Sequence, residues 1–433
     1  MLCIYALGME HRKYKLRDIA TVEISGVDKK HKEGESPVRL CNFVDVYYNW
    51  AITSEMENNF MEATARSNEI ERFKLKKGQV AITKDSETRF DIGIATYIAD
   101  DFDNVILGYH NALITPNPEK LNGKYLNALL HTDYARKYFA NNASGSGQRY
   151  ALSVDALNDF PVPLIPLEEQ IRIGNIFSSI DRKIALNRAI NDNLEAMAKQ
   201  LYDYWFVQFD FPNEEGKPYK SSGGKMIWNE KLKRQIPEGW HCGTLLDIAI
   251  YTNGLACQKF RPTDENKLPV IKIKEMHDGI SPDTEFVKSD IPEAVKVYDG
   301  DVLFSWSASL EVMLWAYGDG GLNQHIFKVT SKNNYPRSFY FYQLIDYIGN
   351  FKRMAEARKT TMGHITQDHL KQSTIALPPN ADIANKLEER LLPVFDAIIT
   401  NSQEIMNLTK QRDELLPLLM NGQVSVNYHL SHD

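Results

Sequence analysis

Cysteine is scarce in this sequence, and the cysteines follow none of the spacings used for disulfide frameworks or zinc sites. The four, Cys3, Cys41, Cys242 and Cys257, include no CxxC pair and stand near no pair of histidines. We therefore expect reduced thiols, as in cytosolic proteins, and no metal site.

Long apolar runs are also missing. No uninterrupted run approaches the ~18 residues that a membrane-spanning helix requires, and residues 1–15 lack the apolar centre of a secretion signal. These two absences predict a cytoplasmic protein with no membrane partner.

An excess of positive charge is absent as well. The formal net charge is −7 at pH 7, and neither half of the chain is basic. Proteins that hold nucleic acid by themselves usually carry a basic surface. If this chain binds DNA, it must use local basic patches or act together with a basic partner.

The common catalytic motifs are absent too. The chain contains no GxxxxGK loop, no GxGxxG after a predicted strand, no GxSxG, no HExxH, and no Asn-Pro-Pro-Tyr/Phe of adenine methyltransferases. Residues 282–288 carry two acidic residues and a lysine, as nuclease sites do, but the spacing is wrong and favours a solvated turn. We therefore predict a binding protein that is not an enzyme and itself binds no cofactor.

What the sequence does contain is a long amphipathic segment, residues 166–210. Pro161, Pro163 and Pro166 oppose a helix before it, and Glu168 and Glu169 suit the first turn of one. Apolar residues then recur at helical spacing: Ile173, Phe177, Ile180, Ile184, Ile190, Leu194, Met197, Leu201 and Trp205. A helix of roughly 35 residues rises about 50 Å, and so long a rod needs a partner for its apolar side.

A second segment of this kind, residues 379–422, can be that partner. Its apolar positions alternate in steps of three and four, the pattern of a coiled-coil seam. Pro393 either kinks this helix or marks its start. We predict that the two helices pair through Phe177, Ile180, Ile184, Leu194, Leu201, Val394, Ile398, Ile405 and Leu415. The alternative is that they are two unrelated amphipathic helices.

The segments before the two helices also resemble each other, in the same order. The matches are Leu16–Ala20 with Leu245–Ala249, Pro37–Leu40 with Pro269–Lys272, Lys77–Val80 with Asp299–Val302, and Tyr150–Leu157 with Gly363–Leu370. Matches in one register indicate a tandem duplication, in which each copy is a globular domain followed by a long helix.

The predicted fold class is therefore α+β: two similar α/β domains joined by two long antiparallel helices that form a coiled coil with pseudo-twofold symmetry. The predicted parts are a first domain (1–165), a long helix (166–210), a polar linker (211–239), a second domain (240–378), a second long helix (379–422) and a tail (423–433). Strands are expected at 38–46, 79–83, 92–98, 105–114, 270–273, 301–305 and 325–330, and helices at 125–140 and 338–355.

Several loops of both domains carry side chains suited to DNA. Arg favours guanine or phosphate, and Asn and Gln favour adenine. The candidates are Gln148, Arg149, Tyr150, His110 and Asn111 in the first domain, and Asn323, Gln324, His325, Arg358 and Lys359 in the second. The alternative is that the loops are surface connections and that His or Asn satisfies buried backbone.

Five motifs together resemble type I restriction-modification specificity subunits, over essentially the whole chain. They are Pro163-Leu-Ile-Pro-Leu-Glu-Glu-Gln170, Leu201-Tyr-x-x-Trp-Phe206, Asp210-Phe-Pro212, Gly216-Lys-Pro-Tyr-Lys220 and Ile236-Pro-Glu-Gly-Trp240. In the second copy, Asn380-Ala-Asp-Ile-Ala384 replaces the acidic-Gln start of the first helix.

The resemblance implies two target-recognition domains that read a gapped, bipartite site in double-stranded DNA. It also implies two adenine methyltransferase subunits and restriction/translocase subunits as partners. S-adenosylmethionine, ATP and Mg would then be bound by those partners. The alternatives are a self-contained nuclease or methyltransferase, which would need a cofactor site, and a coiled-coil DNA-binding or scaffold protein without restriction partners.

Overall fold

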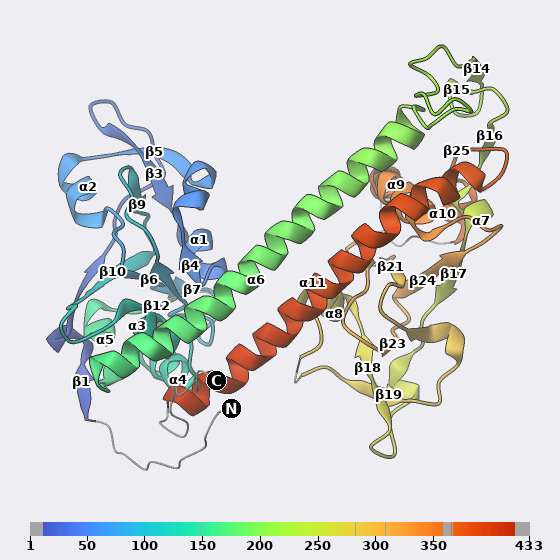
Figure 1. The fold of residues 1–433 in the computed structure, drawn as a ribbon. Coiled ribbons are helices and arrows are strands. Elements are labelled where there is room, and N and C mark those ends of the chain that lie inside the picture. The colour runs from blue at the N-terminus through green and yellow to red at the C-terminus, as the bar shows by residue number, and fades with distance from the viewer. Residues whose placement is uncertain are drawn as a thin grey trace, which may run out of the picture. The chain divides into compact units, whose positions relative to one another are not determined.

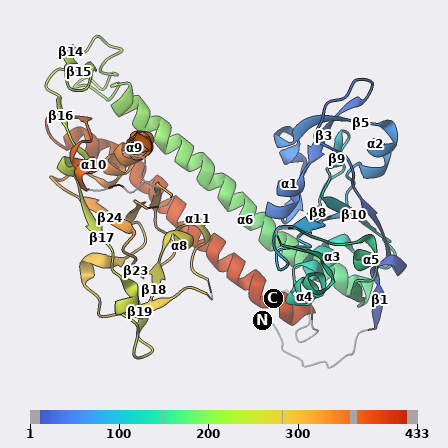
Figure 2. The ribbon, with the colours of Figure 1, turned by 180° about the vertical axis from the view of Figure 1, so that it is seen from behind.

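The computed structural model describes residues 12–147, 149–281, 283–307, 309–357, 365 and 367–420. The chain divides into two compact units, Met1–Ile184 with Leu408–Asp433, and Ala185–Asn407. Each unit contains one globular domain and part of both long helices (Figures 1 and 2).

In the first domain a main sheet packs against a smaller sheet, and helices pack on both sides. The main sheet has the order β2 (Ala20–Ile24), β10 (Asn111–Pro116), β6 (Val80–Thr83), β8 (Ala95–Ile98), β4 (Ala51–Ile52). The smaller sheet has the order β5 (Met61–Ala65), β3 (Ser36–Cys41), β9 (Val105–Leu107). The helices α1 (Phe43–Tyr48) and α2 (Ser67–Phe73) pack in the cluster with the smaller sheet, and α3 (Gly123–Leu130), α4 (Asp133–Asn142) and α5 (Val154–Asn158) pack on the other face of the main sheet.

The central strands are apolar on both faces because both faces are covered. In β6, Val80 and Ile82 pack in the cluster that includes α3 and α4, while Ala81 packs in the cluster under the smaller sheet. A two-stranded ribbon, β1 (Lys13–Lys15) with β13 (Pro161–Pro163), joins the beginning of the domain to its end.

The second domain repeats this topology. Its main sheet has the order β17 (Ala249–Asn253), β24 (Ile326–Ser331), β21 (Val302–Ser305), β22 (Glu311–Leu314). Its smaller sheet has the order β19 (Phe286–Lys288), β18 (Lys267–Ile271), β23 (Gly320–Leu322), β20 (Lys296–Val297), and its ribbon pairs β16 (His241–Gly243) with β25 (Ile375–Leu377). The helices are α7 (Leu245–Ile248), α8 (Ile273–Asp278), α9 (Arg337–Ala357) and α10 (Gln367–Lys371).

The duplication predicted from the sequence is confirmed by this correspondence. The strand pair β3–β9 is parallel, and so is its counterpart β18–β23, whereas β3–β5 and β18–β19 are both antiparallel. The predicted fold class, with two similar α/β domains and two long helices, is likewise confirmed.

Several predicted elements were wrong in their extent. The strand predicted at 92–98 begins only at 95, and residues 270–273 contain the end of a strand and the start of a helix. Residues 38–46 are a strand followed by a helix, because Asn42 and Asp45 form a capping box that starts α1. Residues 105–114 are two strands of different sheets, separated at Gly108–His110. Residues 125–140 are two helices, because Thr132 caps α4 through the Ala135 amide.

The long helices are α6 (Leu167–Tyr202), which continues as a π-helical turn over Asp203–Val207, and α11 (Asp382–Met420). Pro393 lies inside α11 and is not its start. Within the second unit the helices run antiparallel: Asn187 contacts Glu404, and Asn191 contacts Ser402 and the Ile398 carbonyl.

The middle of this helix pair is polar, which the apolar stripe did not predict. Asn187 and Asn191 are buried, and Asn191 Oδ1 also accepts from Asn401 at 2.9 Å. Ile190 and Met197, which the sequence placed on the stripe, are exposed instead. The buried side of α6 therefore follows residues 184, 187, 191, 194 and 198, which are spaced alternately by three and four residues. An apolar pattern does not show this spacing, because two of the five positions are asparagines.

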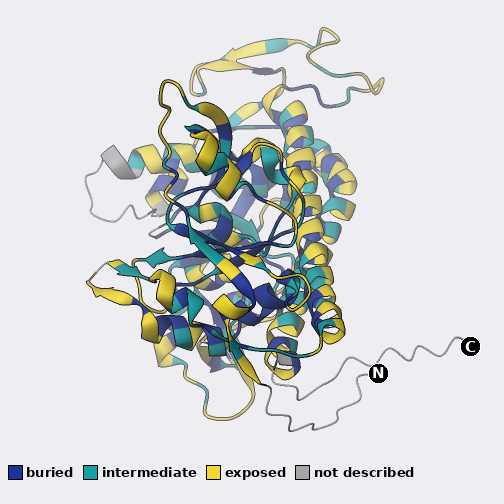
Figure 3. Ribbon diagram, turned by 90° about the vertical axis from the view of Figure 1, so that its left-hand side faces the viewer, coloured by how far each residue is buried: buried dark blue, intermediate teal, exposed yellow. Residues whose placement is uncertain are grey.

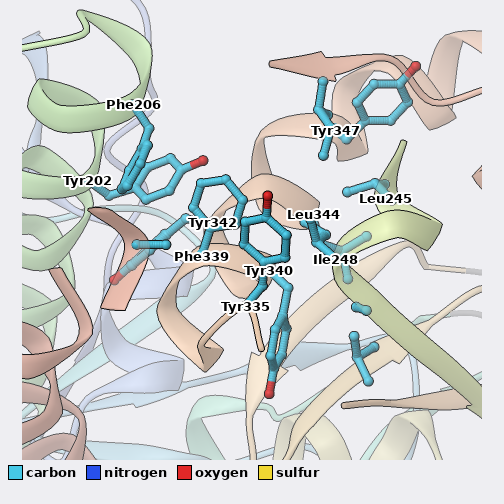
Figure 4. Close-up of a cluster of buried hydrophobic side chains, with 14 of the residues drawn as sticks. Tyr202, Phe206, Leu245, Ile248, Tyr335, Phe339, Tyr340, Tyr342, Leu344 and Tyr347 are labelled. Carbon is cyan, nitrogen blue, oxygen red and sulfur yellow. The ribbon is translucent and has the colours of Figure 1, made fainter. Parts of the chain in front are cut away.

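The predicted pairing residues are all at least half-buried. Phe177, Ile184 and Ile398 are buried; Ile180, Leu194, Leu201, Val394, Ile405 and Leu415 are half-buried. Many of these side chains pack in the hydrophobic clusters of the domains. Figure 3 shows buried and exposed residues alternating along the long helices. Figure 4 shows Tyr202, the last residue of α6, and Phe206 of the following π-helical turn beside Phe339 and Tyr342 of α9.

The start of α6 is fastened to the first domain by the last residue of the Leu-Glu-Glu-Gln motif. Gln170 is fully buried; its Oε1 accepts from the Asn122 amide, and its Nε2 donates to the carbonyls of Lys120 and Ile165. One turn later Gly174 passes close to the first turn of α3. In the second copy Ala384 replaces the glutamine, and Glu388 instead accepts from the Ser338 amide at the start of α9.

The segment 211–239, predicted as a polar linker, contains a folded hairpin of β14 (Met226–Asn229) and β15 (Arg234–Pro237). Phe211 stacks on Tyr219 and on Trp240 with ring centroids 4.9 and 5.4 Å apart. Asp210 accepts from the Ser221 amide and hydroxyl. Three of the sequence motifs thus meet in one aromatic cluster.

Substitution of Gly174 by Ala should destabilise the first unit. The added Cβ would lie 2.7 Å from Lys124 Cβ and 2.9 Å from the Tyr125 nitrogen, so backbone must move. We expect a loss of about 1–3 kcal/mol in unfolding free energy, measured by chemical denaturation. Gly349→Ala in α9 is the matched control: nothing lies within 4 Å, and alanine should stabilise by about 0.5–1 kcal/mol. Equal effects of both substitutions would contradict the packing at Gly174.

The first domain should lose stability in mild acid because of His131. Burial lowers the pKa of this imidazole to about 3, while its Nε2 hydrogen-bonds the Ala95 carbonyl and its ring stacks on Trp50. The unfolded chain binds the proton near pH 6.5, so stability should fall by roughly 1.4 kcal/mol per pH unit below that value, down to about pH 3. Hydrogen exchange of β8 between pH 7.5 and 5 tests this, and His131→Gln should flatten the dependence. If the pH dependence of stability is the same in His131→Gln as in the unsubstituted protein, groups other than His131 cause it.

Candidate nucleic-acid interface

In the first domain, the loop after β6 and the loop before β10 lie next to each other at one end of the main sheet. The strands are antiparallel neighbours, so the chain leaving β6 meets the chain entering β10: the Lys84 amide donates to the His110 carbonyl at 2.9 Å. The Leu152 amide donates to the Lys84 carbonyl at 2.7 Å. Three segments that are distant in the sequence therefore form one surface, which we call the first loop surface (84–94, 108–111, 144–147 and 149–151).

His110 is half-exposed on this surface and is held by a carboxylate. Its backbone is in the left-handed region, with φ of 69°, and its Nδ1 lies 2.6 Å from Asp85 Oδ2. The same oxygen accepts from Lys84 Nζ at 2.9 Å. The contact with Asp85 orients the imidazole ring of His110 through Nδ1. The other ring nitrogen, Nε2, can then donate a hydrogen bond to a phosphate or a base edge, or accept one from a base edge.

Arg149 and Tyr150 lie on a hairpin, where the sequence predicted a flexible loop. β11 (Ser144–Ser146) pairs with β12 (Arg149–Ala151), which also pairs with β7 (Asp85–Ser86). The strands close because residue 145 is glycine, with φ of 127° and no room for a Cβ against the Arg149 carbonyl. Arg149 is exposed, and Tyr150 is half-buried. The candidate Gln148 lies outside the described residues.

Asn111 occupies a different position from its neighbours in the candidate list. The side chain is fully buried, and its Nδ2 donates to the carbonyls of Gly108 and Tyr109 at 3.2 and 3.4 Å. Of the two alternatives considered from the sequence, this geometry favours the structural one, in which Asn111 shapes the turn that presents His110.

The second domain builds the same backbone frame with other side chains. The Trp306 amide donates to the His325 carbonyl, and the Ile365 amide donates to the Trp306 carbonyl. Trp306 and His325 thus occupy the places of Lys84 and His110. Asn323, Gln324 and His325 are half-buried; Asn323 Oδ1 accepts from the His325 amide, and Gln324 Nε2 lies 3.3 Å from His325 Nε2. Arg358 and Lys359 lie outside the described residues.

Two residues of the first loop surface, Lys84 and Asp85, escaped the sequence-based list. They sit where β6 ends, and they hold His110 and β12 together. The signal that could have found them is the duplication itself, because the position of Lys84 is occupied by Trp306 in the second copy.

A cavity of about 1050 Å³ is found in the second unit. None of its lining residues belongs to the loops described above. Its walls come from the end of α6, the β14–β15 hairpin, α9 and β25. Lys199 lines it and forms ion pairs with Asp203 and Asp346, at 2.5 and 2.9 Å. These charges are satisfied by one another, so the cavity has the character of a structural ion-pair site.

Metal and membrane sites were also sought in the described part of the chain. There, His, Cys, Asp and Glu side chains nowhere gather in a group of three or more suited to a metal ion. None of the described helices combines the length and apolar character needed to cross a bilayer.

Comparison with known proteins matches the repeat seen in the fold. The family model described as "Type I restriction modification DNA specificity domain" matches twice, at residues 12–196 and 237–410. The Type I restriction enzyme MjaIX specificity subunit of Methanocaldococcus jannaschii is 26% identical over 403 residues, which cover 90% of this chain and 86% of that protein. The Type I restriction enzyme HindI specificity subunit of Haemophilus influenzae is 23% identical and covers 81% and 87%, respectively.

A solved structure supports the fold independently of sequence. The crystal structure of the type I restriction-modification system S subunit from M. genitalium superimposes with a TM-score of 0.59 at 14% identity, covering 97% of this chain and 99% of that one. The doubled family match spans both globular domains and most of both long helices. The chain therefore belongs to the family of type I restriction-modification DNA specificity subunits.

Proposed function

We propose that this specificity subunit recognises a gapped, bipartite DNA target, one word with each domain, and brings methyltransferase and restriction subunits to it. The observation that carries the proposal is the repeated loop frame. Both domains use the same backbone bonds to present a histidine before a strand, His110 or His325, yet the adjoining residue is Lys84 in one and Trp306 in the other. Because the two domains share this backbone arrangement but place different side chains on it, they are suited to recognise two different base sequences.

The length of α6 supports a gap between the words. Its 36 residues rise about 54 Å at ~1.5 Å per residue, which exceeds one turn of B-DNA, about 34–36 Å. One chain with a recognition domain on either side of this helix in sequence is therefore suited to two words that do not adjoin.

Exposed apolar side chains on the long helices support a role in assembly. In the second unit Leu186, Met197 and Leu392 are 54, 51 and 45% exposed. Apolar groups in such number on two helices favour contact with other subunits. The proposal includes two methyltransferase copies, a restriction/translocase, and a cytoplasmic location; S-adenosylmethionine, ATP and Mg²⁺ would be bound by those partners.

Deletion of the gene in its native host tests the target. We expect the loss of one methylated adenine motif made of two short words separated by unspecified bases, detected by genome-wide methylation sequencing. Return of the motif on complementation is the control. Loss of a continuous motif, or no loss in a host whose methyltransferase is expressed and copurifies with this chain, would contradict the proposal.

Substitution at the two loop frames should separate the two words. Arg149→Ala removes an exposed guanidinium from the first loop surface, and Asn323→Ala removes an amide from the equivalent frame of the second domain. Each should weaken discrimination about 5- to 150-fold, the value of about 1–3 kcal/mol per base contact, in its own word only.

Binding of the methyltransferase complex to duplexes with single base changes in each word provides the measurement. Lys137→Ala, which removes an exposed charge from α4 of the first domain, is the matched control and should leave both words read. Effects of Arg149→Ala on both words alike would show that it contacts phosphate only.

A further inference from the structure

Phe90 is an exposed aromatic residue on the first loop surface. Its 84% exposure is the largest of any bulky apolar residue in the described chain. It lies on the polar connection between β7 and β8. Burial of a Phe side chain is worth about 1.5–3 kcal/mol, so the domain gains nothing from placing one here.

The connection around Phe90 is anchored on both sides. Asp91 Oδ2 accepts from Tyr47 Oη at 2.7 Å, and burial together with this bond raises the pKa of Tyr47 to about 12, so the hydroxyl keeps its proton at neutral pH. On the other side the Arg89 guanidinium lies 5.2 Å from the centre of the Tyr150 ring. The neighbours of Phe90 are thus fixed while its own ring remains in solvent.

These anchors tie Phe90 to the residues proposed to meet DNA. Tyr150 pairs with Ser86 across β12 and β7, and Asp85 in the same short strand holds His110. The exposed cations Arg89 and Arg149 flank this region. The carboxylates of Asp85 and Asp91 are both engaged by internal partners.

The second domain shows that the fold does not require this arrangement. Its equivalent connection, 306–310, is short, and Trp306 there donates from Nε1 to Asn253 Oδ1. On α8, Lys274, His277 and Asp278 replace Val44, Tyr47 and Tyr48 of α1. Among the described residues of the two equivalent connections, only Phe90 is an exposed aromatic; Trp306 is half-buried.

An exposed aromatic face on a loop surface that also carries exposed guanidinium groups is suited to stack on an unstacked base. Methylation of adenine requires that base to leave the stack, and a side chain that enters the stack lowers the cost of the opening. We propose that Phe90 stacks into the DNA of the word read by the first domain, at a step opened when the complex engages its target. This rests on the proposed function.

The test uses the full chain in complex with its methyltransferase and duplexes carrying 2-aminopurine in either word. Phe90→Ala should weaken binding about 5- to 150-fold, as loss of one base–aromatic stack does, and should lower the 2-aminopurine emission in the first word only. Phe90→Trp should restore both. A duplex with an abasic position at the opened step should reduce the deficit of Phe90→Ala, because that step needs no unstacking.

Trp228→Ala, which removes another exposed aromatic, is the matched control. Unchanged affinity and emission for Phe90→Ala, with both words still discriminated, would overturn the inference and leave the proposed function standing. Loss of copurification with the methyltransferase in the absence of DNA would also overturn it, since Phe90 would then be a protein contact. Absence of any word preference in the unsubstituted complex would instead refute the proposed function.

Discussion

The central sheet of each domain is apolar on both faces, and most of the remaining structure follows from the need to cover both. In the first domain the smaller sheet with α1 and α2 covers one face, and α3, α4 and α5 cover the other. In the first domain α6 belongs to that second cover, through Phe177 and the buried Gln170. The long helix is therefore part of the domain core, and the loops at the ends of the strands are left to meet a ligand.

Much of this organisation was predictable because the sequence contains two copies of the same domain, so that each sequence pattern can be compared with its counterpart in the other copy. Weak matches such as Leu16–Ala20 with Leu245–Ala249 gained weight from their common order, and the structure confirmed the repeated topology. Errors arose where polar residues decide local structure. The capping box of Asn42 and Asp45 ended a run that looked like one strand, and Asn187 and Asn191 filled seam positions that the apolar pattern assigned to Ile190 and Met197.

The candidate interface was predictable only in part, for a related reason. His110 and Arg149 stand out by residue type, but the frame that joins them consists of backbone bonds from the Lys84 amide and carbonyl. Such bonds carry no residue-type signature. Burial likewise separates Asn111 from His110, its neighbour in sequence, and only packing in three dimensions decides which of two adjacent polar residues faces solvent.

The ribbons β1–β13 and β16–β25 hold the first and last strands of each domain side by side. The two chain ends of each domain therefore lie next to each other, so everything between the two strands can be exchanged as one unit without moving the point where the chain continues into the following long helix. Under the proposed function, exchange of one such domain would change one word of the target and leave the core of the other domain intact.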